Sequence, residues 1–187
     1  GIAGDYIDVS ISVKLLDNFI SSLNAQPVSG QQYVTYDVKN DMTLNLADYG
    51  ISEPIVNTAV FTVDSESALT VSGAGSVSSQ KAVFEIKDDT TAQKGGSVNI
   101  TDGKMTAGTD IITFDRYGSF NISGGNLAAN ENVVHVRTES KTDAEITGGI
   151  TGGYIDGKTN IDKAKCDRVA ITGGFYTEPA KTAFDMI

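Results

Sequence analysis

The segment Phe120-Asn121-Ile122-Ser123-Gly124-Gly125 decides the fold, because its pattern returns along the chain. Apolar and polar residues alternate and a glycine pair follows, which is typical of a short, half-buried strand that ends in a tight turn. The other copies are Met42-Thr43-Leu44-Asn45-Leu46, Leu69-Thr70-Val71-Ser72-Gly73, Val98-Asn99-Ile100-Thr101-Asp102-Gly103, Ala144-Glu145-Ile146-Thr147-Gly148-Gly149 and Val169-Ala170-Ile171-Thr172-Gly173-Gly174. The matching Val or Ile positions (71, 100, 122, 146 and 171) are 22 to 29 residues apart, which indicates a repeat architecture.

A second strand precedes most copies, and a third, shorter strand follows the glycine. The second strand reads Val60-Phe61-Thr62-Val63, Val83-Phe84-Glu85-Ile86, Ile111-Ile112-Thr113-Phe114 and Val133-Val134-His135-Val136. The expected inward residues of the third strand are Val77, Met105, Leu127 and Phe175. A β-sandwich would not repeat one phrase in register, and no unit has a helical period. We therefore expect like residues to stack about 4.8 Å apart in parallel sheets, with Ile146 directly above Ile122.

The predicted fold is all-β: one domain built as a right-handed parallel β-helix (solenoid) of about six coils. Residues 33–180 are expected to form the β-helix, residues 1–32 an N-terminal segment, and residues 181–187 a C-terminal tail. The stretch Val9 to Asn24 places apolar residues at helical spacing, so we expect an N-terminal α-helix that caps the first coil. Such a cap would cover the open edge of the first strands, which otherwise invites pairing with another chain.

Composition excludes several classes of function. With 14 Lys and Arg against 24 Asp and Glu, the formal charge is −10, which disfavours binding to nucleic acid or an anionic membrane. No apolar run approaches the ~20 residues of a membrane span, so membrane insertion is not expected. Cys166 and His135 are single, so neither a disulfide nor a His/Cys zinc site can form within the chain. No cofactor is expected; calcium held by Asp37, Asp41, Asp64, Asp88, Asp89 or Asp110 is the alternative left open.

The outward positions of the expected sheets hold no stacked pair of carboxylates. One sheet would show Thr62, Glu85, Thr113 and His135, and the next Thr70, Asn99, Asn121, Glu145 and Ala170. No catalytic residue is therefore predicted, because polysaccharide cleavage needs clustered carboxylates. The candidate ligand-binding residues are Asp110 and Asp115 near one corner and three tyrosines, Tyr117, Tyr154 and Tyr176, whose rings could stack on sugars. Tyr154 and Tyr176 are expected at comparable corners of late coils.

The segment Asp41–Leu46 and the repeated Ile-Thr/Ser-Gly-Gly phrase resemble those of pectin-lyase-like β-helix repeat proteins. Similar repeats occur in surface proteins of gut Firmicutes and in phage fibres, and the closing segment Ile171–Pro179 is similar to the way such repeats end. The resemblance implies a non-enzymatic extracellular or virion-surface module that serves as a rigid stalk and binds a glycan or cell-surface receptor. The alternative it implies is a polysaccharide lyase or glycoside hydrolase. A homotrimer is the oligomer expected of a virion fibre.

Overall fold

The computed structural model describes residues 36–53, 59–138, 145–160 and 169–177. Within these ranges the regular secondary structure is β-strand, and the strands stack into a parallel β-solenoid. The predicted fold class is therefore confirmed. The predicted capping helix at Val9 to Asn24 and the tail at 181–187 lie outside the described residues.

The solenoid has three faces. The first face contains β1 (Tyr36–Val38), β4 (Phe61–Val63), β7 (Phe84–Ile86), β12 (Ile112–Phe114) and the C-terminal parts of β14 (Asn126–Val136) and β16 (Tyr154–Asn160). The second face contains β2 (Met42–Asn45), β5 (Ala68–Ser72), β10 (Ser97–Ile100), β13 (Tyr117–Ile122), β15 (Glu145–Ile150) and β17 (Val169–Ile171). The third face contains β3 (Gly50–Glu53), β6 (Ser76–Ser79), β11 (Lys104–Ala107), the N-terminal parts of β14 and β16, and β18 (Phe175–Tyr176).

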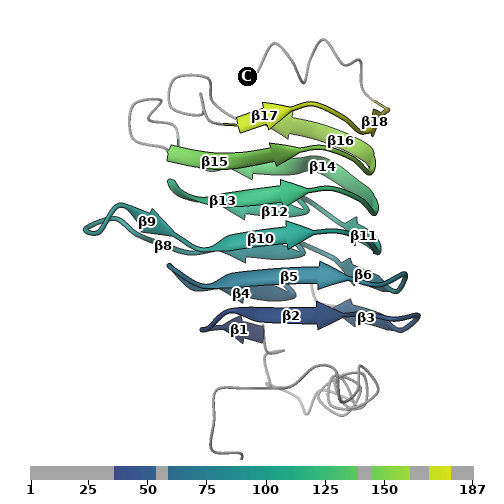
Figure 1. Ribbon diagram of the computed structural model, residues 1–187, viewed down its shortest axis with the longest axis horizontal. Helices are drawn as coiled ribbons and strands as arrows, with labels where there is room; N and C mark the ends of the chain where they lie inside the picture. The colour runs from purple at the N-terminus through teal and green to yellow at the C-terminus, as the bar shows by residue number, and fades with distance from the viewer. Residues whose placement is uncertain (1–35, 54–58, 139–144, 161–168, 178–187) are drawn as a thin grey trace, which may run out of the picture.

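The chain climbs from β1 at one end to β17 and β18 at the other, as Figure 1 shows. In that view the strands of the second face lie in front and point right, while those of the first face lie behind and point left, which is a right-handed winding. This is the hand that parallel crossover connections favour. An antiparallel hairpin, β8 (Asp88–Asp89) with β9 (Lys94–Gly95), projects between the first and second faces.

About four turns, from β1 to the start of β14, have their three strands and both intervening corners described. The predicted number of about six coils is therefore too high for complete turns. The repeated phrase that led to it lies on the second face alone. The number of copies therefore equals the number of strands on that face, not the number of complete turns. That face has six strands, in the order β17-β15-β13-β10-β5-β2.

Like residues stack on like residues in the core. On the first face, Phe61 pairs in register with Phe84, and their rings are stacked with centroids 5.7 Å apart. Ile112 and Val134 continue this column. On the second face, the buried column is Leu44, Val71, Ile100, Ile122, Ile150 and Ile171. The prediction that matching residues of successive coils lie directly over one another is confirmed for these columns, with one exception.

The exception is Ile146, which was expected above Ile122 but pairs with Gly118, while Ile150 takes the expected place. The phrase Ile-Thr-Gly-Gly occurs twice in succession, at 146–149 and 150–153, and the chain uses the second copy. The second copy supplies the turn, since Gly153 has φ +92° and the Tyr154 N–H donates to Gly125 O at 2.9 Å. As a consequence, the place expected for Glu145 next to Asn121 is taken by Gly149.

The third face also differs from the prediction at its last strand. Phe175 was expected to face inward, but its side chain is 77% exposed. The inward column is Ile51, Val77, Met105, Leu127, Ile155 and Tyr176. Because side chains alternate along a strand, a shift of one residue moves Phe175 to the outside and Tyr176 to the inside.

Candidate functional site

The insertion between β7 and β10 forms a hairpin that is held at its tip and on its side. Asp89 Oδ1 accepts the N–H groups of Thr91 and Ala92 at 2.8 and 3.0 Å, which closes the tip. Lys94 donates to Glu66 of the coil below. This hydrogen bond raises the pKa of Lys94 above its ordinary value of 10.5. The hairpin is therefore a defined projection whose backbone groups have local partners.

The base of the hairpin is tied to the following coil by Asp88. Its Oδ2 accepts the backbone N–H of Arg116 at 3.0 Å and that of Tyr117 at 3.2 Å. A carboxylate that accepts two backbone N–H groups is well satisfied without a cation. Asp88 therefore fixes the start of β13 against the hairpin, and the side chains of Arg116 and Tyr117 are left for other contacts.

A column of charged side chains follows the end of the first face. Arg137 Nη2 lies 3.1 Å from Glu85 Oε1, and its Nη1 lies 3.5 Å from Asp115 Oδ1. Two coils lower, Lys87 Nζ lies 3.8 Å from both Asp37 and Asp64. Each cation of this column is therefore paired with two carboxylates from other coils. Arg137 lies across from the hairpin residues Asp88 and Thr90, and two carboxylates balance its charge.

An open groove of about 410 Å³ lies between the hairpin and this column of charges. We call it the hairpin groove; its lining residues are Asp88, Thr90, Asp115, Arg116, Arg137 and Thr138. Its volume falls within the range of ~300–1,000 Å³ that is usual for small-molecule sites. Two of the chain's three arginines line it. Arg116 forms no ion pair with any residue that the structure describes, so its guanidinium faces solvent with free donors.

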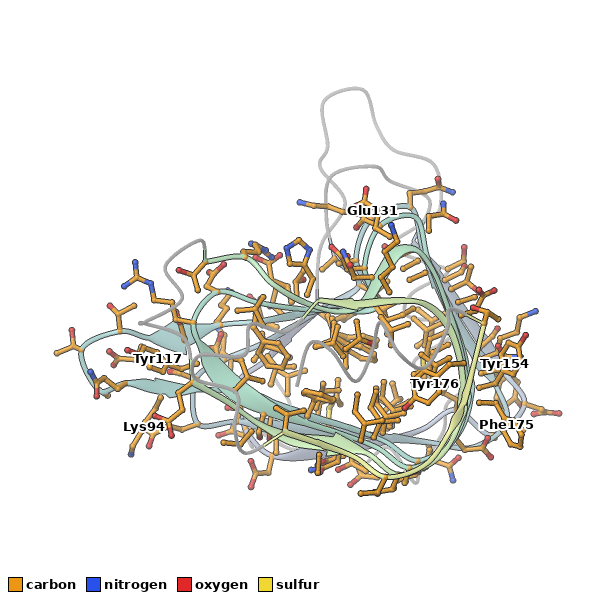
Figure 2. The ribbon with its side chains drawn as sticks, turned by 90° about the horizontal axis from the view of Figure 1, so that it is seen from above. Lys94, Tyr117, Glu131, Tyr154, Phe175 and Tyr176 are labelled. Carbon is orange, nitrogen blue, oxygen red and sulfur yellow. The ribbon has the colours of Figure 1, made fainter. Side chains whose placement is uncertain are left out.

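The structure separates the five candidate ligand-binding residues into three places. Asp115 lines the hairpin groove, and Tyr117 follows the groove residue Arg116 at the start of β13. Figure 2, which looks along the solenoid axis, shows Tyr117 beside Lys94 on one side of the molecule and Tyr154 and Tyr176 on the opposite side. Asp110 belongs to a third group, at the corner before β12. Of the five candidates, Asp115 lines the hairpin groove, and Tyr117 lies two residues further along the chain without lining it.

Tyr154 and Tyr176 do not lie at comparable positions, contrary to the prediction. Tyr154 is 45% exposed and has Phe175 as its neighbour on the next strand, so these two rings share the outer surface. Tyr176 instead lies over Ile155 and covers the inward column. Its hydroxyl donates to Gly173 O at 2.9 Å, and burial raises its pKa above 10.0. The contacts of Tyr176 are thus those of a core residue at the end of a column.

Asp110 is buried and organises the corner before β12. Its Oδ1 accepts the backbone N–H and the side-chain amide of Asn132 at 3.0 and 2.8 Å. His135 Nδ1 lies 3.3 Å from Asp110 Oδ2 and also 3.3 Å from Asn132 Nδ2. When protonated, Nδ1 can donate to the carboxylate, and when unprotonated it can accept from the amide. Both forms of the ring thus have a partner, as in a structural cluster.

The middle of the second face presents an uncharged surface. Its two central outward columns, read across the strands, are Thr43, Thr70, Asn99, Asn121, Gly149 and Ala170, and beside them Asn45, Ser72, Thr101, Ser123, Thr151 and Thr172. Asn121 Nδ2 donates to Asn99 Oδ1 at 3.0 Å, and Asn99 Nδ2 donates to Thr70 Oγ1 at 3.3 Å. These ladders run along the solenoid axis and provide hydrogen-bond partners for the polar side chains.

Sequence reasoning missed Arg116, Arg137 and Thr90 as groove residues. Arg137 could have been found, because it follows His135 by two residues and so falls in the same outward column as Asp115 in the preceding coil. Arg116 lies between the candidates Asp115 and Tyr117, so the same corner signal applied to it, whereas Thr90 lies in an insertion outside the repeat and carried no signal.

Within residues 36–53, 59–138, 145–160 and 169–177, no three His, Cys, Asp or Glu side chains are grouped so that they could hold a metal ion. Those same residues contain no helix long and apolar enough to cross a membrane. Comparison of the chain with protein-family models, with curated proteins and with solved structures finds no match.

Proposed function

We propose that this chain is a rigid, non-enzymatic module of a cell surface or a virion, and that it binds a glycan in the hairpin groove. The observation that carries the proposal is the groove itself. It combines free guanidinium donors on Arg116 with carboxylate acceptors on Asp88 and Asp115 and a threonine hydroxyl on Thr90. Sugars present closely spaced hydroxyls that both donate and accept, so they need such a mixed lining.

The solenoid supports the role of a rigid scaffold. Each coil contacts its neighbours through continuous parallel ladders and shared core columns, so length and stiffness come from short repeats. The hairpin departs from this regular repeat and forms one wall of the groove. A projecting, well-anchored insertion on a stiff scaffold is a common place for binding residues.

The resemblance of the repeated phrase to those of β-helix proteins from gut Firmicutes and phage fibres supports the proposed location. The two origins predict different assemblies. A phage fibre is expected to be a trimer, and a domain of a bacterial surface protein a monomer. Size-exclusion chromatography with light scattering would distinguish them, because it measures the mass of the particle in solution.

A glycan array probed with the labelled chain tests binding. The site is tested with Arg137→Met, which removes a groove residue, and with Tyr154→Ala as the matched control on the opposite side of the solenoid. We expect Arg137→Met to lose binding and Tyr154→Ala to keep it. The reverse result would place the site at the exposed ring pair of Tyr154 and Phe175, and an array with no bound glycan would refute the proposed function.

The second candidate function is a polysaccharide-cleaving enzyme, which the pairing of buried Asp110 with His135 favours. A reducing-sugar assay and an assay for unsaturated products on a polysaccharide panel address it. Turnover that disappears in Asp110→Asn, with the fold intact by circular dichroism, would favour the enzyme over the binding module.

A further inference from the structure

The two arginines of the hairpin groove differ in whether they form ion pairs with described residues. Arg137 is held by Glu85 and Asp115, so its positive charge is already balanced. Arg116 is the cation left over. The lining holds two carboxylates, on Asp88 and Asp115, against the two guanidinium groups of Arg116 and Arg137, and Glu85, the partner of Arg137, adds a third carboxylate beside it. The groove and its first neighbours therefore carry more negative than positive groups, in a chain of net charge −10.

The carboxylates and the guanidinium group of Arg116 can both make further hydrogen bonds. Asp88 uses Oδ2 for the backbone of β13, and Asp115 uses Oδ1 for Arg137. The second oxygen of each carboxylate has no partner among the residues that the structure describes. The groove thus offers two carboxylate acceptors and one planar guanidinium donor, which can bind two adjacent oxygens at once.

We infer that the hairpin groove selects an uncharged sugar unit and discriminates against acidic sugars. The inference rests on the proposed function and names the class of glycan that this same groove takes. Sugar hydroxyls donate to Asp88 and Asp115 and accept from Arg116, so each group in the groove finds a partner. A ligand carboxylate can only accept. It would satisfy Arg116, but it could not donate to Asp88 or Asp115 and would bring a further negative charge beside them.

Arg116 is the specificity-determining residue in this arrangement. Its backbone N–H is fixed by Asp88, while its side chain has no ion pair among the described residues that would compete with a ligand. Because the side chain is exposed, Arg116→Ala removes the donor without leaving a buried charge unpaired. The variant is therefore expected to fold like the wild type.

The test is a titration of the isotope-labelled full chain with two matched probe sets, followed by nuclear magnetic resonance. One set contains neutral oligosaccharides, and the other contains oligosaccharides of the same length built from uronic acids. We expect shifts of groove resonances with neutral probes only, an affinity that added salt leaves unchanged, and at least a tenfold loss in Arg116→Ala. Lys104→Ala, on the third face, is the control and should bind as the wild type does.

The outcomes separate the inference from the proposed function. If uronic-acid probes bind the groove more tightly, and the binding is lost in Arg116→Ala and weakened by salt, the inference is overturned while glycan binding in the groove stands. If neither set shifts any groove resonance, the proposed function and the inference both fail. Binding of neutral probes that Arg116→Ala leaves unchanged overturns the inference about Arg116 and its selectivity.

Discussion

Replacing Thr159 by valine should stabilise the protein, whereas the same change at Thr113 should not. Both threonines are buried, with 3% and 4% of their surface exposed. Among the residues that the structure describes, Thr159 Oγ1 has no hydrogen-bond partner, whereas Thr113 Oγ1 donates to Phe84 O at 3.1 Å. The two threonines are therefore almost equally buried. They differ in that the Thr113 hydroxyl makes a hydrogen bond, while the Thr159 hydroxyl makes none with any described residue.

The position of Thr159 follows from the pairing of β16 with β14. Lys158 pairs with Asn132, and the next residue pairs with Val134, so the register shifts by one residue between them. The shift places Thr159 at the end of the inward column that contains Phe61, Phe84 and Ile112. At this place the hydroxyl is buried and has no partner within the part of the chain that the structure describes.

The magnitude follows from these contacts. An unpaired buried hydroxyl costs about 1–3 kcal/mol, so Thr159→Val should gain about that amount. A satisfied hydrogen bond contributes about 0.5–1.5 kcal/mol, which Thr113→Val should lose. The added methyl group and the higher β-propensity of valine act on both variants alike and cancel in the comparison. We therefore expect Thr159→Val to be more stable than Thr113→Val by about 2 kcal/mol or more.

Urea unfolding followed by circular dichroism measures the difference, with equal m-values as the sign that both variants unfold from the same state. A thermal melt should show the same order, at roughly 2–4 °C per kcal/mol for a domain of this size. If Thr113→Val proves as stable as Thr159→Val, then Thr159 does not lie unpaired in the core and the register of β16 is wrong.

Three further predictions concern the backbone, the end of the core and the Asp110 corner. Gly148→Ala should cost more than about 3 kcal/mol in urea unfolding, because Gly148 has φ +110° and an added Cβ would lie 1.7 Å from a carbonyl oxygen of the neighbouring strand. Gly50→Ala, which meets only a serine hydroxyl at 3.1 Å, should stay within about 1 kcal/mol, and equal losses at both positions would contradict the pairing of β13 with β15. Since burial raises the pKa of Tyr176, its neutral form is favoured in the folded state. The contribution of Tyr176 to stability should therefore be constant below pH 10.0 and fall as the pH rises above it, and Tyr176→Phe should flatten this fall in unfolding curves taken across that range. Asp110→Ala should lower the free energy of unfolding by about 2–3 kcal/mol because it removes the acceptor of the Asn132 backbone N–H and one of the two partners of its side-chain amide, and a loss below about 0.5 kcal/mol would show that this corner does not depend on the carboxylate.

The candidate site was less predictable than the fold. Asp115 and Tyr117 were predicted because charged and aromatic residues at a corner stand out from a regular repeat, and of the two Asp115 lines the groove. The groove itself depends on residues from three separate segments: the hairpin, the corner before β13 and the end of β14. An insertion has no partner in the repeat, so its position could not be derived from the pattern. The exposed ring of Phe175 was likewise missed, because a strand of two residues is too short to show which face is inward.

By itself, the sequence determined that the chain is a column of stacked coils. A phrase that returns with the same alternation can bury its apolar residues in every copy at once only if the copies lie parallel and in register. Tertiary structure alone decided which of the two consecutive Ile-Thr-Gly-Gly phrases enters the stack, and with it the positions of Ile150, Glu145 and Gly149. Both phrases have the same local preferences, and only the alignment of the turn at Gly153 and the packing against the coil below distinguish them.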